Sequence, residues 1–350
     1  SMNDFVDHFK SISNTPHNHL SIDNYTHSRE DTLVIDQLDM QFSIVEIIKT
    51  ISSMNRNKSA DYYNNVADFF IEAKDFISPY LCTIFNKICD SGIYPESWCN
   101  GVIVPIHKKG DVFNPSNYRG NILINVIAKI FSLTLRNRLN KWCETEHIFN
   151  DYQFGFRDKR STADAIFILH ATIQKILSKN SKLWCAFIDY EKAFDTVIRD
   201  ALWVKLLQSG ISCKMVTIIK SIYNNVKACV KLSSSMNMSE FFDVTLGLKQ
   251  GEPLSPILFI LFINDIVDSI DFNTLTDDDL NMLTRYLILF ADDIVLFTTD
   301  ATSLQSQIDK IAQYSLNWGL KINVNKTKVC VFEKRKQNHN AQFVINGENV

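Results

Sequence analysis

Two adjacent carboxylates, Asp292 and Asp293, lie in the middle of the apolar run 287–297. The β-branched and aromatic residues on both sides predict two short strands, joined by a hairpin with the two aspartates at its turn. Each carboxylate raises the pKa of the other unless a cation neutralises them. A divalent cation would keep both ionised, and ligands that are all oxygen suit Mg²⁺. A solvated Asp-Asp turn is the alternative that the pair alone leaves open.

A third candidate carboxylate, Asp189, follows the apolar segment 183–188, which predicts a buried strand. A carboxylate at the end of a strand is well placed to hold a metal ion. Glu191 and Asp195 follow within six residues. We interpret Glu191 as part of a polar helix start and Asp195 as a structural cap or ion-pair partner.

Lys108, Lys109 and Arg119 flank one turn that follows the predicted strand 101–106. Such cations can hold a triphosphate, lysine as a point charge and arginine as a planar fork. An exposed basic hairpin is the alternative. Backbone phosphates could dock on a second group of cations, which precedes the helix predicted over about 161–177: Arg157, Lys159 and Arg160.

A polar turn containing Gln250 and Gly251 precedes a nearly all-apolar helix, predicted over 257–269. Ser255 is a suitable cap for this helix and Pro256 a suitable first residue. A glycine at position 251 would let another backbone or a ligand approach closely.

Composition allows one large domain or two ordinary ones, because the chain has 350 residues, 46% of them apolar. The net charge is −3, but residues 100–141 carry seven Lys or Arg and one Asp, whereas 265–300 carry nine Asp and one Arg. Such a distribution is expected if the protein holds a polyanion against an acidic site loaded with metal ions. Two solvated faces of opposite charge are the alternative. Eight scattered cysteines, without a C-x-x-C pair, indicate reduced thiols in an intracellular protein.

Other segments predict the elements that position these residues. Residues 1–39 are polar and aperiodic, and we expect a flexible lead-in. Helices are predicted over 42–54 and 122–142, and a helical apolar face follows the Asp-Asp hairpin. Two strand pairs are predicted, 226–232 with 241–246 and 321–324 with 328–332.

Several motifs follow one another along the chain: Val104-Pro105-Ile106-His107-Lys108-Lys109-Gly110-Asp111, Asn117-Tyr118-Arg119-Gly120, Gln153-Phe154-Gly155-Phe156-Arg157, Phe187-Ile188-Asp189, Ala193-Phe194-Asp195, Gln250-Gly251-Glu252-Pro253-Leu254-Ser255-Pro256, Phe290-Ala291-Asp292-Asp293, Trp318-Gly319-Leu320 and Asn325-Lys326-Thr327-Lys328. Taken in order, these motifs resemble the reverse transcriptase domain of a non-LTR (LINE-type) retrotransposon over about residues 55–335. Glu252 departs from the pattern of this family, because a small residue is usual at its position. The Glu252 charge must point away from a triphosphate or weaken the binding of the nucleotide.

The resemblance implies an RNA-directed DNA polymerase, a nucleotidyltransferase. Asp189 and Asp292 would bridge two Mg²⁺ ions, which Mn²⁺ could replace, with Asp293 as a weaker ligand. Phe194 would exclude a ribose 2′-OH, and Lys326 would protonate the leaving pyrophosphate. The partners implied are an RNA template, a DNA primer and a deoxynucleoside triphosphate; the remaining residues implied in nucleotide binding are Lys108, Lys109, Arg119, Gln250 and Gly251.

The implied fold is α+β, the fingers and palm of a right-hand polymerase, with an antiparallel palm sheet backed by helices. We expect a lead-in over 1–40, fingers over 41–182 and a palm over 183–335 with an insertion at about 211–247. A tail over 336–350 would end before the missing thumb. A catalytically weak RNA-binding remnant and a group II intron-type maturase core remain alternatives. No membrane segment or signal peptide is evident, so nuclear or cytoplasmic localisation is expected; the oligomeric state is open.

Overall fold

The computed structural model describes residues 1–14, 33–232, 237–270, 287–335 and 339–350. These residues form two compact units, which are described one at a time. The first comprises Ser1–Glu146 and Phe194–Leu258, and the second comprises His147–Ala193 and Phe259–Val350. Parts of the predicted lead-in (15–32), insertion (233–236), acidic stretch (271–286) and tail (336–338) lie outside the described residues. The predicted finger and palm boundaries remain predictions.

The helical part of the first unit packs around aromatic side chains. Phe85 and Phe131 are fully buried, with ring centroids 5.0 Å apart in an edge-on arrangement. Polar side chains set the helix starts: Ser43 accepts a hydrogen bond from Glu46 N, and Asn125 accepts from Ile127 N. The helices of this unit are α1 (Met2–Ser13), α2 (Asp36–Asp39), α3 (Ile44–Ser52), α4 (Ala67–Glu72), α5 (Lys74–Ser91), α6 (Val126–Thr145), α8 (Arg199–Gln208) and α9 (Cys213–Tyr223), with short 3-10 turns at Glu96–Trp98 and Pro115–Asn117.

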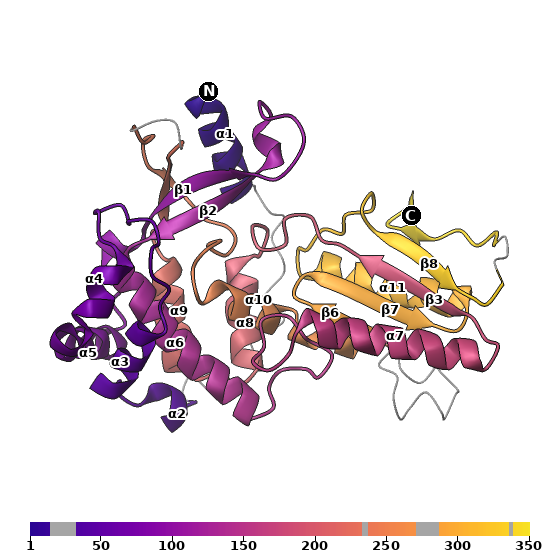
Figure 1. Cartoon of the computed structure of the whole chain (residues 1–350), viewed down its shortest axis with the longest axis horizontal. Coiled ribbons are helices and arrows are strands. Elements are labelled where there is room, and N and C mark those ends of the chain that lie inside the picture. Colours follow the sequence, from indigo (N-terminus) through magenta and orange to yellow (C-terminus); the bar gives the residue numbers. More distant parts are fainter. Residues whose placement is uncertain (15–32, 233–236, 271–286, 336–338) are drawn as a thin grey trace. The chain divides into compact units, whose positions relative to one another are not determined.

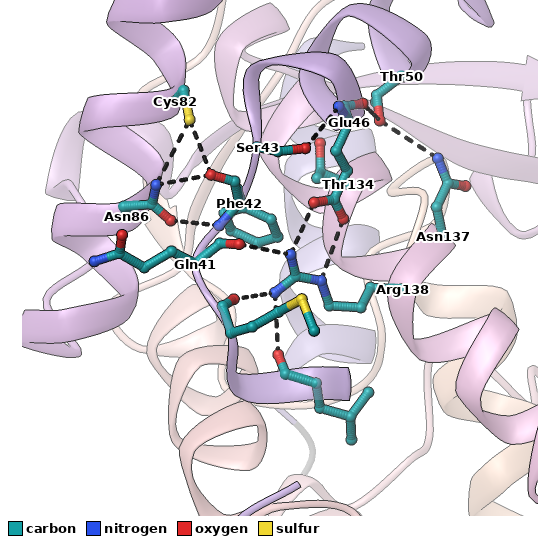
Figure 2. Close-up of polar contacts among 12 residues, drawn as sticks. Gln41, Phe42, Ser43, Glu46, Thr50, Cys82, Asn86, Thr134, Asn137 and Arg138 are labelled. Carbon is teal, nitrogen blue, oxygen red and sulfur yellow. Dashed lines mark hydrogen bonds and ion pairs between the residues drawn. The ribbon is translucent and has the colours of Figure 1, made fainter. Parts of the chain in front are cut away.

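One buried arginine ties α6 to α3 and to the segment before it. Arg138 donates to both carboxylate oxygens of Glu46, at 3.2 and 2.8 Å, and to the carbonyl oxygens of Leu38, Met40 and Gln41. Its guanidinium also lies 4.1 Å from the centroid of the Phe42 ring. Figure 2 shows these contacts converging on Arg138. Arg138 belongs to the predicted basic stretch, but its guanidinium is occupied by contacts within the protein. It is therefore a structural residue and not part of a surface that binds a polyanion.

A mixed sheet completes the first unit. Its strand order is β2-β1-β4-β5, with β1 parallel to β4 and the other pairs antiparallel. β1 and β2 form the hairpin that carries the predicted basic turn, and pairing of β4 with β5 confirms the predicted strand pair over 226–246. The strands are β1 (Asn100–His107), β2 (Tyr118–Ile124), β4 (Lys227–Val230) and β5 (Phe242–Asp243).

Within the predicted flexible lead-in, residues 2–13 form the helix α1, so the expectation that this segment is aperiodic is wrong there. Phe9 of α1 is 7% exposed and belongs to the same core as Ile103 and Val230 of the sheet. At the end of the helix, Asn14 donates to the carbonyl of Asp243 at 2.8 Å. The apolar residues of this helix recur at helical spacing, so a local signal was present, and the sheet supplies the surface that they cover: Met2, Phe5, Val6, Phe9 and Ile12.

The second unit is built on an antiparallel sheet of order β6-β7-β3-β8. Helix α7 packs on one face through Ala165 and Ile176, against Cys185 and Phe187 of β3. Helix α11 contacts β3 and β7, and Figure 1 shows α7 in front of the strands and α11 behind them. The predicted α+β fold, with an antiparallel sheet covered by helices, is confirmed. The elements are α7 (Thr162–Ser178), α11 (Ala301–Asn317), β3 (Leu183–Ile188), β6 (Leu287–Phe290), β7 (Asp293–Thr298), β8 (Lys328–Phe332), β9 (Val344–Ile345), β10 (Glu348–Asn349) and a 3-10 segment at Asn264–Ser269; α10 (Ser255–Phe262) runs from the first unit into the second.

One predicted strand pairing of the second unit is wrong. β8 pairs with β3 rather than with residues 321–324, where the only bridge among the described residues joins Ile322 to Tyr190. The loop before β8 is instead held beside the end of β3 by Asn323 N, which donates to the Asp189 carbonyl at 2.7 Å. This loop thereby becomes part of the candidate site.

Candidate active site

The Asp-Asp hairpin forms as predicted, at the end of the second unit's sheet. β6 and β7 pair antiparallel, and the last pair is Phe290 with Asp293. Ala291 and Asp292 make the connection, and Ala291 has a φ of 55°, in the left-handed region. Asp293 is exposed and Asp292 is half-buried. Two carboxylates are thus presented at one tight turn.

Strand pairing brings Asp189 to this turn across more than a hundred residues of sequence. β3 runs antiparallel to β7, with Ile188 opposite Ile294. The next residues along the two strands are Asp189 and Asp293, so their backbones are neighbours at the same edge. Because side chains alternate along a strand, Asp189 faces the same side of the sheet as Cys185 and Phe187.

Mutual repulsion is visible in the electrostatics of the turn. Burial raises the pKa of Asp293, and the charges of Asp292 and Asp189 raise it further, whereas Lys326 lowers it. A carboxylate whose pKa is raised by two neighbouring carboxylates is stabilised by a nearby cation. The three aspartates therefore form one electrostatic group that favours a positive charge.

Lys326 supplies such a charge in this structure. Its Nζ lies 3.1 Å from Asp189 Oδ2, and its side chain is 61% exposed. The lysine sits in the loop before β8, where Thr327 is fully buried and its hydroxyl accepts from Asp189 N at 3.4 Å. The loop that positions Lys326 therefore also holds the backbone of Asp189.

An open cleft of about 770 Å³ lies beside these groups in the second unit. Ile166 and Leu169 of α7 line one wall and Phe290 lies on the sheet side, while Asp293 and Lys326 supply polar lining. The cleft thus combines apolar surface with the charged turn.

The carboxylate set suits Mg²⁺ in its chemistry, since hard cations prefer carboxylate oxygens. Within the described ranges, however, no three His, Cys, Asp or Glu side chains are arranged as a metal-binding group. Asp189 is ion-paired to Lys326 instead. The residues fit the ion by donor type and by their mutual repulsion, so a bound cation would have to draw the carboxylates away from the lysine.

In the first unit, a chain of hydrogen bonds links three polar side chains. Arg119 Nε donates to Gln250 Oε1 at 2.8 Å, and Gln250 Nε2 donates to Asp195 Oδ1 at 2.6 Å. Ile122 N also donates to the Gln250 carbonyl at 2.8 Å. The structure therefore brings Arg119 and Gln250 together, and it gives Asp195 a hydrogen bond from the neutral Gln250 amide, whereas the predicted role as a cap or ion-pair partner remains a prediction.

The neighbouring predicted residues have clear places in the first unit. Gly251 has a φ of 105°, and an added Cβ would lie 2.8 Å from the Ile122 carbonyl oxygen, so only glycine fits this approach. Phe194 is half-buried, and its carbonyl accepts from Leu248 N at 2.8 Å. Lys108 and Lys109 are exposed at the β1–β2 turn.

Two of the three cations before α7 have structural partners as well. Arg157 donates to the Asn150 carbonyl at 2.9 Å, and its guanidinium lies 5.2 Å from the Phe149 ring centroid. Arg160 pairs with Asp151 at 2.6 Å. Lys159 is exposed, with a positive φ of 60°. Phosphate binding by these residues remains a prediction.

Sequence reasoning missed a buried charged pair beside Gln250. Lys249 is 4% exposed and donates to the Ile222 carbonyl at 3.1 Å, and Glu252 is 2% exposed and accepts from Ser255 N at 2.9 Å. Burial lowers the pKa of Lys249 to about 8, although Glu252 opposes this shift. The unusual Glu252 is thus turned into the first unit, where it caps the start of α10. The available signal was the pair of opposite charges three residues apart, directly before a nearly all-apolar helix.

The chain belongs to the reverse transcriptase (RNA-dependent DNA polymerase) family, whose model matches residues 106–344. Its resemblance to the reverse transcriptases of non-LTR retrotransposons is confirmed by its relatives. The chain is 27% identical, over 81% of its length, to a probable RNA-directed DNA polymerase from transposon BS of Drosophila melanogaster. It is 26% identical, over 73% of its length, to the RNA-directed DNA polymerase from mobile element jockey of the same species. It spans only 31% and 28% of those two proteins.

Solved structures agree on the fold. Apo telomerase from Candida tropicalis, truncated from its C-terminal domain, matches 84% of this chain with a TM-score of 0.51 at 15% identity, over 61% of the telomerase chain. Telomerase from Candida tropicalis in complex with a fragment of telomeric RNA matches 77% of this chain, also with a TM-score of 0.51, at 14% identity and over 48% of that chain. Members of this polymerase family copy a nucleic-acid template and normally use divalent metal ions. None of the helices in the described ranges is both long and apolar enough to cross a membrane.

Proposed function

We propose that this chain copies RNA into DNA, adding deoxynucleotides to the 3′-OH of a DNA primer. The observation that carries the proposal is the meeting of Asp189 with the Asp292–Asp293 turn at one sheet edge. Membership in the reverse transcriptase family supports the reaction type. The chain covers less than a third of its polymerase relatives, so the activity of this portion is the point to be tested.

Asp189, Asp292 and Asp293 would hold two Mg²⁺ ions, or Mn²⁺ in their place. When bound, the metal ions lower the pKa of the primer 3′-OH and stabilise the charge that develops on the transferred phosphate. The repulsion that raises the pKa of Asp293 supports this assignment, because a cation between the carboxylates relieves it.

Lys326 would change its partner during the reaction. It neutralises Asp189 in this structure, with 3.1 Å between Nζ and Oδ2. Once a metal ion takes that role, the exposed ammonium becomes available to give a proton to the leaving pyrophosphate. The ion pair supports the proposal because it places a proton donor at the carboxylate that would hold the ion.

Nucleotide recognition would fall to the first unit. The exposed cations Lys108, Lys109 and Arg119 would bind the triphosphate, with Gln250 and Gly251 lining the pocket. The hydrogen bond from Arg119 Nε to Gln250 Oε1 fixes the plane of the guanidinium, which supports a role in recognising a planar or forked anion. Phe194 would block a ribose 2′-OH, and Arg157, Lys159 and Arg160 would contact the template or primer backbone.

The test is extension of a labelled DNA primer annealed to an RNA template, with Mg²⁺ and the four deoxynucleotides. Asp189→Asn and Asp292→Asn should each lower the rate by about 100-fold or more, since metal stabilisation is worth several kcal/mol. Asp309→Asn, an exposed carboxylate of α11, is the control and should leave the rate unchanged. Equal activity in all four proteins would rule out the assigned carboxylates.

A further inference from the structure

A buried glutamine reaches the backbone of the Asp-Asp turn. Gln153 is 1% exposed, and its Oε1 accepts hydrogen bonds from Ala291 N at 2.9 Å and from Gly155 N at 2.7 Å. Ala291 N belongs to the residue immediately before Asp292. One side-chain oxygen thereby fixes the turn to a loop that lies 138 residues earlier in the chain.

The backbone around Gln153 lies along β6 and strengthens this link. Phe154 N donates to the Leu289 carbonyl at 2.8 Å, and Leu289 N donates to the Tyr152 carbonyl at 2.9 Å. Gly155 completes the contact: an added Cβ at this position would lie 2.3 Å from Ala291 N. Residues 152–155 therefore form a bracket around the start of the turn.

The turn has two reasons to need such a bracket. Ala291 adopts a φ of 55°, a left-handed conformation that is unfavourable for alanine. The turn also presents two carboxylates whose charges repel each other. A single acceptor that binds Ala291 N favours this conformation over one that relaxes the backbone and separates the charges.

The orientation of the Gln153 amide follows from its two donors. An amide rotated by half a turn would place Nε2 against two N–H groups, which cannot accept a hydrogen bond from it. Nε2 is buried and has no hydrogen-bond partner among the residues that the structure describes. The Gln153 side chain therefore keeps its oxygen on the turn while its buried amide donor stays unsatisfied. A glutamine that only filled space in the core would not be held in this unfavourable arrangement.

We propose that Gln153 is a positioning residue, which holds Asp292 and Asp293 in the arrangement that takes up metal ions. The inference rests on the proposed function of these carboxylates, but the bracket itself can be tested without turnover. Gln153 is buried and would act on the two carboxylates only through the Ala291 backbone. The bracket is distinct from the phosphate docking predicted for Arg157, Lys159 and Arg160, which follow it in the chain.

The main test compares Gln153→Met with Gln153→Glu. Methionine has a similar length but no acceptor, so the Ala291 amide of a protein labelled with ¹⁵N-alanine should exchange with solvent about tenfold faster or more, since its buried hydrogen bond is lost. Glutamate keeps an acceptor at the same place and should keep the amide protected. Ile176→Val is the control for a general loss of stability, because Ile176 lies in the hydrophobic core of the second unit. The Ile176 carbonyl accepts a hydrogen bond from Ser181 N, just before β3 begins, so this residue lies at the opposite end of β3 from Asp189.

Two further measurements separate positioning from simple loss of stability. Mn²⁺ affinity, followed by electron paramagnetic resonance, should weaken in Gln153→Met and remain unchanged in Ile176→Val. In primer extension, Gln153→Met should lower kcat by about 10–100-fold, as expected for misplaced reacting groups, with little change in the KM for the deoxynucleotide.

The outcomes distinguish this inference from the proposed function. Normal exchange at Ala291 and normal Mn²⁺ affinity in Gln153→Met would overturn the bracket, whatever the activity. Equal losses in Gln153→Met and Ile176→Val would also overturn it, because Gln153 would then be a core residue only. If the wild-type chain extends no primer, the proposed function fails, while amide exchange and Mn²⁺ binding still decide whether Gln153 positions the turn.

Discussion

Replacing Lys249 by methionine should reveal a pH-dependent term in the stability of this protein. Burial lowers the pKa of Lys249 from 10.5 to about 8. At about 1.4 kcal/mol for each pH unit, this difference corresponds to about 3 kcal/mol. The unfolded chain keeps the lysine protonated up to its ordinary pKa, whereas the folded chain releases the proton earlier. The folded state is therefore penalised below the folded pKa, and the penalty disappears as the pH rises toward the unfolded pKa.

The measurement is urea unfolding of the wild type and of Lys249→Met at about pH 7 and about pH 10, a range that spans most of this change. The stability of the wild type relative to the variant should increase by about 2 kcal/mol over this range, because only the wild type has the lysine. Tyr223, Arg199, Cys99 and Glu252 also face this site, and the comparison keeps all four in both proteins.

A second background controls for the partner charge. The Glu252 carboxylate raises the pKa of Lys249, so the pH-dependent difference should grow when both proteins also carry Glu252→Gln. A difference between wild type and Lys249→Met that does not change with pH, in either background, would refute the reasoning. It would mean that Lys249 keeps its ordinary pKa and is therefore hydrated.

Three other predictions follow from the contacts described above. Arg138→Met should lower the free energy of unfolding by about 3 kcal/mol in urea titrations, since it leaves the Glu46 carboxylate and three backbone carbonyls without their donor; Arg136→Met, at a half-buried position two residues earlier in the same helix, is the control. Gly155→Ala should abolish the protection of the Ala291 amide, because the new Cβ cannot fit beside it. Phe194→Ala should admit ribonucleotides while largely preserving deoxynucleotide use in single-nucleotide incorporation; an unchanged ratio would make Phe194 a core residue only.

Local patterns predicted the central elements correctly. The apolar runs around Asp189 and around the Asp292–Asp293 pair each became strands, and their polar ends became the site. These predictions succeeded because carboxylates at the end of a buried apolar strand are unusual, and this feature is visible in the local sequence. The pairing of these two strands is seen only in the order of the sheet. At the level of sequence, the family resemblance alone implied that they pair.

Contacts that depend on distant residues were not predictable in the same way. Gln153 looks like any polar residue before a helix, and only the fold places it under Ala291. Arg138 was counted among the cations of a basic segment that suits a polyanion, although Glu46 and three carbonyls surround it. In each case the partner lies far away in the sequence, and side-chain type alone does not distinguish a buried charge from an exposed one.

The most direct test of the central claim locates the metal ions without measuring synthesis. Fe²⁺ in place of Mg²⁺, with ascorbate and peroxide, generates hydroxyl radicals that cut the backbone next to the bound ion, and mass spectrometry identifies the cut sites. The account predicts cleavage beside Asp189 and within the 291–293 turn in the same protein, suppressed by excess Mg²⁺ and lost in Asp189→Asn. Cleavage confined to other segments, or unchanged in Asp189→Asn, would contradict a shared metal site at this sheet edge.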